Sequence, residues 1–280
     1  MIQLEQRVFV EFADPINHPR AKVWIPPEYT LTGGGAIVLW GKAGNILTAS
    51  YPIKKDGEAI YTGWEARAKD HRIADPAPLI VYAIGFKLLT ENGALKLDQD
   101  VVTATSKTPV NHPKLNVKLV NVESVLTGGG AFVDWKNSGN LLTASFPISS
   151  DGNSYTGWEV RAKDHIDADP ASISVYAIGI NLPNSVAQSI KIIQKVIVMP
   201  STTPVNHPQG DVRMDDGFTL TGGGAIDNWD TAGNLLTASF PTRRSGELDY
   251  KGWNVRGKDH ERPDISTVTC YAIGIKATSV

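Results

Sequence analysis

The sequence predicts an all-β protein made of three tandem copies of one antiparallel β-sandwich unit. Two observations lead to this fold class. Several short motifs recur at a constant offset along the chain, which is the mark of an internal repeat. Within each copy, apolar and polar residues alternate with the period of a strand, and no segment carries a convincing helical period.

The repeated motifs divide the chain into three units. Each motif occurs three times, and its copies lie 94 or 95 residues apart. Leu-Thr-Gly-Gly-Gly-Ala begins at residues 31, 126 and 220, Gly-Trp at 63, 157 and 252, and Tyr-Ala-Ile-Gly at 82, 176 and 271. We therefore expect units at residues 1–90, 91–185 and 186–280. The joints are short, which favours units that pack together over units on flexible linkers.

Strand candidates follow one another in order within the first unit. They are short stretches rich in β-branched and aromatic residues, at residues 7–12, 21–25, 30–32, 36–40, 46–51, 64–68 and 79–86. Gly, Pro and Asn separate them, as expected for turns. In the second unit, Ser172–Ile180 alternates most clearly, with Ile173, Val175 and Ala177 on one face. About six strands in such a unit predict a small antiparallel sandwich.

Two architectures fit three such units. The one we favour packs three complete sandwiches around a pseudo-threefold axis, as a covalent pseudo-trimer. In the alternative, each unit supplies one face of a single β-prism-like body with pseudo-threefold symmetry.

Composition excludes some functions. The chain has 280 residues and a formal net charge of −2, so a broad nucleic-acid surface is not expected. No apolar stretch has the length of a membrane span, and no secretory signal is visible. The location therefore stays open, and release or action outside the cell is compatible with the sequence. The single cysteine, Cys270, allows no internal disulfide, and its apolar strand pattern predicts a buried residue.

The triple glycine is predicted to have a structural role. A phosphate-binding loop would need spaced glycines, usually a Lys-Ser/Thr pair, and a following helix. Here Gly33, Gly34 and Gly35 precede an apolar strand. We expect them to form a bulge or to let another backbone approach closely.

The segment from Gly-Trp to Lys-Asp-His carries the most chemistry. An indole can stack on a sugar ring, and Arg, Asp and His can bond to hydroxyl groups. The candidate ligand-binding residues are Trp64, Arg67, Asp70 and His71, Trp158, Arg161, Asp164 and His165, and Trp253, Arg256, Asp259 and His260. A structural interpretation fits the same residues. In it the tryptophan lies in the core, the aspartate caps backbone amides in a turn at the strand end, and the histidine hydrogen-bonds to a buried group.

No cofactor is expected, although calcium remains possible. Asp70, His71 and Asp75 could contribute to a divalent metal site if they converge. A second hypothesis places His18 and its copies together on the pseudo-threefold axis. No catalytic set emerges, because HExxH, GxSxG and a repeated Cys-His pairing are all missing. We therefore expect that the protein is not an enzyme. A hydrolase would need a pair of acidic residues, and Asp70 with Asp75 is the only candidate pair.

Part of each unit resembles the H-type lectin family. The residues that carry the resemblance are Gly63, Trp64, His71 and Ala83–Gly85, with Gly157, Trp158, His165 and Ala177–Gly179, and Gly252, Trp253, His260 and Ala272–Gly274. The resemblance implies six-stranded sandwiches, a trimeric arrangement, and His71, His165 and His260 as contacts to galactose-type sugars. That family usually has an aromatic residue before the histidine, where this chain has aspartate. The motif order is also similar to repeats in uncharacterised bacterial proteins, which suggests an extracellular setting.

These observations together favour a non-enzymatic, multivalent binding protein. We expect a lectin-like protein with one carbohydrate site per repeat and with glycans or glycoconjugates as partners, because repeated sites increase avidity. The alternative is a structural or assembly protein, such as a coat, fibre or tail component or a toxin's targeting module, with self-association as its main interaction.

Overall fold

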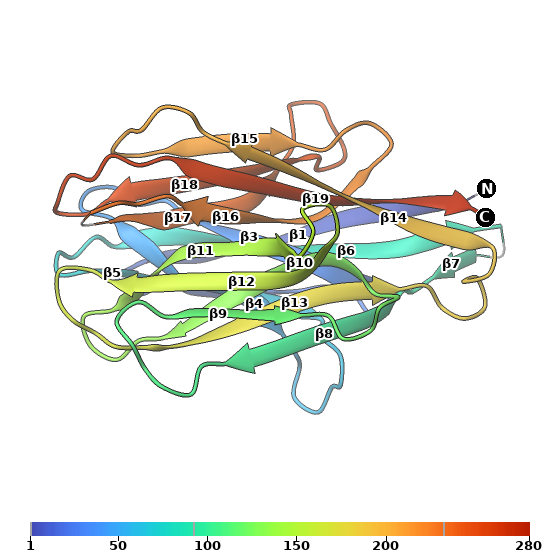
Figure 1. Cartoon of the computed structure of the whole chain (residues 1–280), viewed down its shortest axis with the longest axis horizontal. Helices are drawn as coiled ribbons and strands as arrows, with labels where there is room; N and C mark the ends of the chain where they lie inside the picture. The colour runs from blue at the N-terminus through green and yellow to red at the C-terminus, as the bar shows by residue number, and fades with distance from the viewer. Residues whose placement is uncertain (1, 92, 232) are drawn as a thin grey trace.

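The computed structural model describes residues 2–91, 93–231 and 233–280, and these residues form nineteen β-strands and no helix (Figure 1). The first repeat contains β1 (Gln3–Ile16), β2 (Arg20–Trp24), β3 (Thr30–Val38), β4 (Asn45–Ile53), β5 (Gly63–Asp70) and β6 (Ala77–Thr90), followed by β7 (Gly93–Leu95). The second contains β8 (Asp98–Thr105), β9 (Lys114–Lys118), β10 (Val125–Asp134), β11 (Asn140–Ser149), β12 (Tyr155–Asp164) and β13 (Ser172–Asn181). The third contains β14 (Ile190–Pro200), β15 (Gln209–Arg213), β16 (Thr219–Asp227), β17 (Asn234–Thr242), β18 (Gly252–Asp259) and β19 (Val268–Ser279).

The strands form three antiparallel sheets, and every sheet is shared by two repeats. One has the order β1-β6-β3-β17-β18-β15, with β7 beside β6. The others have the orders β2-β5-β4-β10-β13-β8 and β14-β19-β16-β11-β12-β9. Each repeat thus gives three strands to each of two sheets. The all-β, repeated organisation expected from the sequence is confirmed, whereas the sharing of sheets was not anticipated.

Two strands meet at the centre of each sheet, and we call these meeting places the junctions. The first junction joins β4 to β10, the second joins β11 to β16, and the third joins β17 to β3. Each pairing is short. At the first junction, for example, Ala131 faces Ser50 and Phe132 faces Ala49. The chain therefore closes into a ring, in which repeat 3 meets repeat 1.

The triple glycine makes these close approaches possible. The register shifts between Leu31 and Gly33, which marks a bulge. A Cβ atom added to Gly33 would lie 2.6 Å from the carbonyl oxygen of Thr221 in repeat 3. At Gly35 it would lie 2.3 Å from the carbonyl oxygen of Ser239, also in repeat 3. Both structural roles expected for the glycines are present, and the second and third copies repeat them.

The middle glycine accommodates the repeat's own tryptophan. A Cβ atom on Gly34 would lie 2.3 Å from the Trp64 ring. Trp64 and its copies are 0–1% exposed, and the Nε1 of Trp64 donates to Ser50 Oγ at 2.9 Å. These indoles belong to one continuous apolar core that includes residues from all three repeats.

Two rings of side chains line the centre of the molecule. Thr32 Oγ1 donates to the Thr221 carbonyl at 3.0 Å, Thr127 to Thr32 at 2.9 Å, and Thr221 to Thr127 at 2.9 Å. Each threonine thus bonds to a different repeat in a closed cycle. Three fully buried aliphatic side chains form a separate cluster, Ile46, Leu141 and Leu235, one from each repeat.

Candidate functional site

The four residue types predicted to bind a ligand lie in four different environments. Trp64, Trp158 and Trp253 are buried in the core, so their faces are packed against protein. The glycine at position 34 leaves room for the Trp64 ring inside the protein. This arrangement distinguishes a core tryptophan from one that stacks on a ligand. These tryptophans act as core anchors.

The histidines of the Lys-Asp-His motif meet one another. Their ring centroids are 5.3–5.5 Å apart, and His71, His165 and His260 are 0–1% exposed. The Nε2 of His260 lies 2.8 Å from the His71 carbonyl oxygen, and that of His165 lies 2.6 Å from the His260 carbonyl oxygen. A carbonyl oxygen only accepts, so these nitrogens donate. Burial, together with nearby His260 and Lys69, holds the pKa of His71 below its ordinary value.

The hypothesis that placed His18 and its copies at the centre is wrong. His18 is 55% exposed, and its Nε2 lies 3.0 Å from Asp70 Oδ1. His112 and His207 contact Asp164 and Asp259 in the same way, at 3.1 and 2.9 Å. The difference arises because Asn-His-Pro forms the turn before an edge strand, whereas Lys-Asp-His ends a strand next to its copies.

The aspartates do not converge with the histidines. Asp70 faces His18, whereas Asp75 Oδ2 accepts backbone N–H groups from Gly41, Lys42 and Gly44 at 3.3, 3.0 and 2.7 Å. Asp169 and Asp264 accept amides in the same loop of their own repeats. Asp75 therefore has the capping role that the turn hypothesis expected. Within residues 2–91, 93–231 and 233–280, no three His, Cys, Asp or Glu residues are grouped so as to hold a metal ion.

The arginines lie at the junctions, and they are the predicted residues closest to an open surface. The Nε of Arg67 contacts Glu65 Oε1 at 2.5 Å, and Arg20 and Lys22 contact the same carboxylate at 2.7 and 3.5 Å. Burial opposes the charge on Glu65, but hydrogen bonds from Arg20 and Arg67 outweigh it and hold its pKa below the ordinary value. One buried carboxylate thus fixes three cationic side chains at this surface.

Each junction also carries a stacked aromatic pair contributed by two repeats. The pairs are Tyr51 with Tyr176, Phe146 with Tyr271, and Phe240 with Tyr82, with ring centroids 5.5, 5.6 and 5.6 Å apart. The arginine of the same junction lies against this pair. The Cζ of Arg161, for example, is 5.2 Å from the centre of the Phe146 ring.

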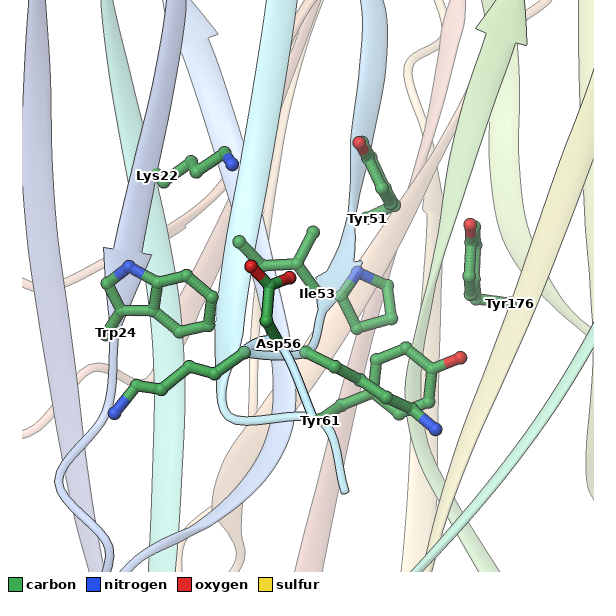
Figure 2. Close-up of a pocket in the computed structure, with 10 residues that line it drawn as sticks. Lys22, Trp24, Tyr51, Ile53, Asp56, Tyr61 and Tyr176 are labelled. Carbon is green, nitrogen blue, oxygen red and sulfur yellow. The ribbon is translucent and has the colours of Figure 1, made fainter. Parts of the chain in front are cut away.

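At the first junction the aromatic pair opens into a hollow of about 590 Å³. Figure 2 shows Trp24 on one side, Tyr176 on the other, and Ile53 and Asp56 between them. Tyr51 and Tyr61 complete the aromatic lining. Burial raises the pKa of Tyr51 to about 12 and raises that of Tyr61. At neutral pH these phenols are therefore protonated and can both donate and accept hydrogen bonds.

The predicted Arg67 does not line this hollow, but its Nη2 donates to the Tyr51 hydroxyl at 3.2 Å. The aromatic lining was not predicted from the sequence. Tyr176 begins the Tyr-Ala-Ile-Gly motif, and Tyr51 follows the Leu-Thr-Ala-Ser motif, so both belonged to repeated strings. Trp24 carried a different signal, since it is the one tryptophan outside the repeat pattern. These residues come from strands far apart in the chain, and only the pairing of β4 with β10 brings them together.

No helix among the residues that the structure describes is long and apolar enough to cross a membrane. No protein-family model matches the chain, and no curated protein matches its sequence.

Proposed function

We propose that this chain is a non-enzymatic, multivalent carbohydrate-binding protein, in which three repeats joined through shared sheets act as a covalent pseudo-trimer with one site at each junction. The observation that carries the proposal is the aromatic hollow of the first junction, where Trp24, Tyr61 and Tyr176 surround an open space. Aromatic faces pack against the apolar faces of sugar rings, and neighbouring polar groups bond to hydroxyls. The proposed contacts are thus the aromatic residues, with Arg67 and its copies packed beside the aromatic pairs.

The geometry of the junctions supports binding by a preformed site. Both walls of each junction are β-strands held by backbone ladders and by the shared core. Rigid walls reduce the entropy lost when a ligand binds. Three junctions on one body also permit simultaneous contact with a branched or clustered glycan, which increases avidity without a new contact.

The test is a glycan array with the whole chain and the Trp24→Ala variant. Trp24 is half-buried on edge strand β2, so its truncation is expected to leave the core intact. Phe12→Ala is the control, since Phe12 is an exposed aromatic residue on edge strand β1 that does not line the hollow. We expect Trp24→Ala to weaken the signal at least fivefold, a loss typical of one aromatic contact. A blank array for the unmodified chain would refute the proposal.

A structural or assembly function is the second candidate, and the sheet edges favour it. Strands β1 and β14 lie at the edges of their sheets. Phe12 on β1 is 68% exposed, and Met199 on β14 is also exposed. Open edges with apolar side chains can pair with another chain. Light scattering after size exclusion over a range of concentrations distinguishes the two functions, since larger species without a glycan response would favour assembly.

A further inference from the structure

The three junctions share an aromatic frame but differ in the charge around it. At the first junction, three lysines and one aspartate line the hollow, which gives a net formal charge of +2 on a chain whose total is −2. The lysines are Lys22, Lys54 and Lys55, and the aspartate is Asp56. The hollow is therefore a local positive site on a slightly acidic protein.

The lysines are placed beside the aromatic rings. The Nζ of Lys54 lies 4.5 Å from the centre of the Tyr61 ring, and that of Lys55 lies 5.7 Å from the Trp24 ring. Lys22 lies on the same side of the hollow as Trp24 in Figure 2, with its Nζ 3.5 Å from Glu65. A six-membered ring packed against Trp24 or Tyr61 would thus carry its substituents close to an ammonium group.

The second junction has the same frame without this charge. Its Phe146 and Tyr271 stack as Tyr51 and Tyr176 do. The residues equivalent to Lys22, Trp24, Lys54, Lys55 and Asp56 are Asn116, Lys118, Ser149, Ser150 and Asp151. These positions hold one lysine and one aspartate, so their net formal charge is zero.

The third junction has the same charge without the Trp24 ring, because Asp211, Arg213, Arg243 and Arg244 give the equivalent positions a net formal charge of +2. It has Arg243 and Arg244 at the positions of Lys54 and Lys55. However, Arg213 at the position of Trp24 is ion-paired with Glu247, and Asp211 replaces Lys22. The Trp24 ring and a positively charged rim therefore occur together at the first junction.

We infer that the hollow of the first junction selects negatively charged saccharides, that is, sugar rings bearing a carboxylate or a sulfate. This inference rests on the proposed function and assigns a ligand class to one of its sites. The ring packs against Trp24 and Tyr61, while the acidic group meets Lys54 and Lys55. Opposite charges across a binding surface supply specificity and faster association more than a large affinity.

The experiment is an array in which each neutral glycan is printed beside its sialylated and its sulfated form. We expect at least one acidic form to bind the unmodified chain about tenfold more tightly than its neutral partner, as two exposed charge contacts allow. The preference should shrink as salt rises. Comparing the sialylated with the sulfated forms shows whether a carboxylate or a sulfate is selected.

The repeats supply matched variants. Lys54→Ser with Lys55→Ser gives the first junction the loop residues of the second, and we expect it to abolish the acidic preference but retain neutral binding. Ser149→Lys with Ser150→Lys makes the reverse exchange and is expected to increase acidic binding. Equal binding of neutral and acidic forms, or a preference that survives the lysine exchange, would overturn the inference alone. Failure of every glycan in every form would overturn the proposed function as well.

Discussion

A buried aspartate in the third repeat allows a quantitative test of the packing. Asp227 ends β16 and is 3% exposed, at a position that Val38 and Val133 occupy in the other repeats. Its Oδ1 accepts a hydrogen bond from Ser266 Oγ at 2.7 Å, and its Oδ2 has no hydrogen-bond partner. A Cβ atom on Gly257 would lie 2.0 Å from Oδ2. The glycine and the serine, which replace alanines of the other repeats, thus accommodate the carboxyl group.

The energetic consequence depends on pH. Burial, with a smaller contribution from Asp264, raises the pKa of Asp227 from its ordinary 3.8 to about 7. Well below pH 3.8 the carboxyl group is protonated in both folded and unfolded chains, so its ionisation does not affect stability there. As pH rises toward 7, the unfolded chain ionises first and the folded state loses stability. Since one pH unit corresponds to about 1.4 kcal/mol, the loss above pH 7 is up to about 4 kcal/mol.

The perturbation is Asp227→Asn, which keeps the shape and removes the charge. We expect the free energy of unfolding to rise by about 2–4 kcal/mol at pH 8 and to change little at pH 4. Urea unfolding followed by tryptophan fluorescence at the two pH values measures it. Asp230→Asn is the control, because Asp230 is exposed three residues further along. An equal gain at both pH values, or none at pH 8, would refute the reasoning.

Three other predictions concern the packing. Gly128→Ala should lower the melting temperature by several degrees, because the new Cβ would lie 2.5 Å from a carbonyl oxygen of a neighbouring repeat. Gly41→Ala is the control: its new Cβ would have no atom closer than 3.7 Å, so this variant should melt like the parent. Burial lowers the pKa of His71, so the unfolded chain binds a proton at this histidine more readily than the folded chain does. In the Asp227→Asn background, the free energy of unfolding measured in urea should therefore fall as pH drops from 7 to 5. A flat profile would contradict this. Burial raises the pKa of Cys270 to about 12, so a thiol reagent at pH 8 should label it only after unfolding, and rapid labelling of the folded chain would exclude a buried thiol.

The sequence predicted the repeats and strands because each depends on local information. Motif spacing shows a repeat directly, and alternation follows from the two faces of a strand. The role of Gly33 was also within reach, since a glycine before an apolar strand indicates close backbone approach.

The candidate site was harder to predict because it forms between repeats. Alternation places Tyr176 on one face of β13, but it does not say that Tyr51 from another repeat packs there. The same limit applies to His71, which is followed by Arg72 with a φ of 59°. Ile166 and Glu261 have the same left-handed conformation after their histidines, and the spacing of the Lys-Asp-His motif does not indicate this turn.

The cyclic arrangement of sheets has a consequence for how stability is distributed. A linear array of three repeats has two interfaces and two terminal repeats that need caps. In this chain the pairing of β17 with β3 adds a third interface, so every repeat has two neighbours and none is terminal. Unfolding any one repeat therefore breaks two interfaces together. We expect the three repeats to unfold as a single cooperative unit, without the end-fraying of an open array.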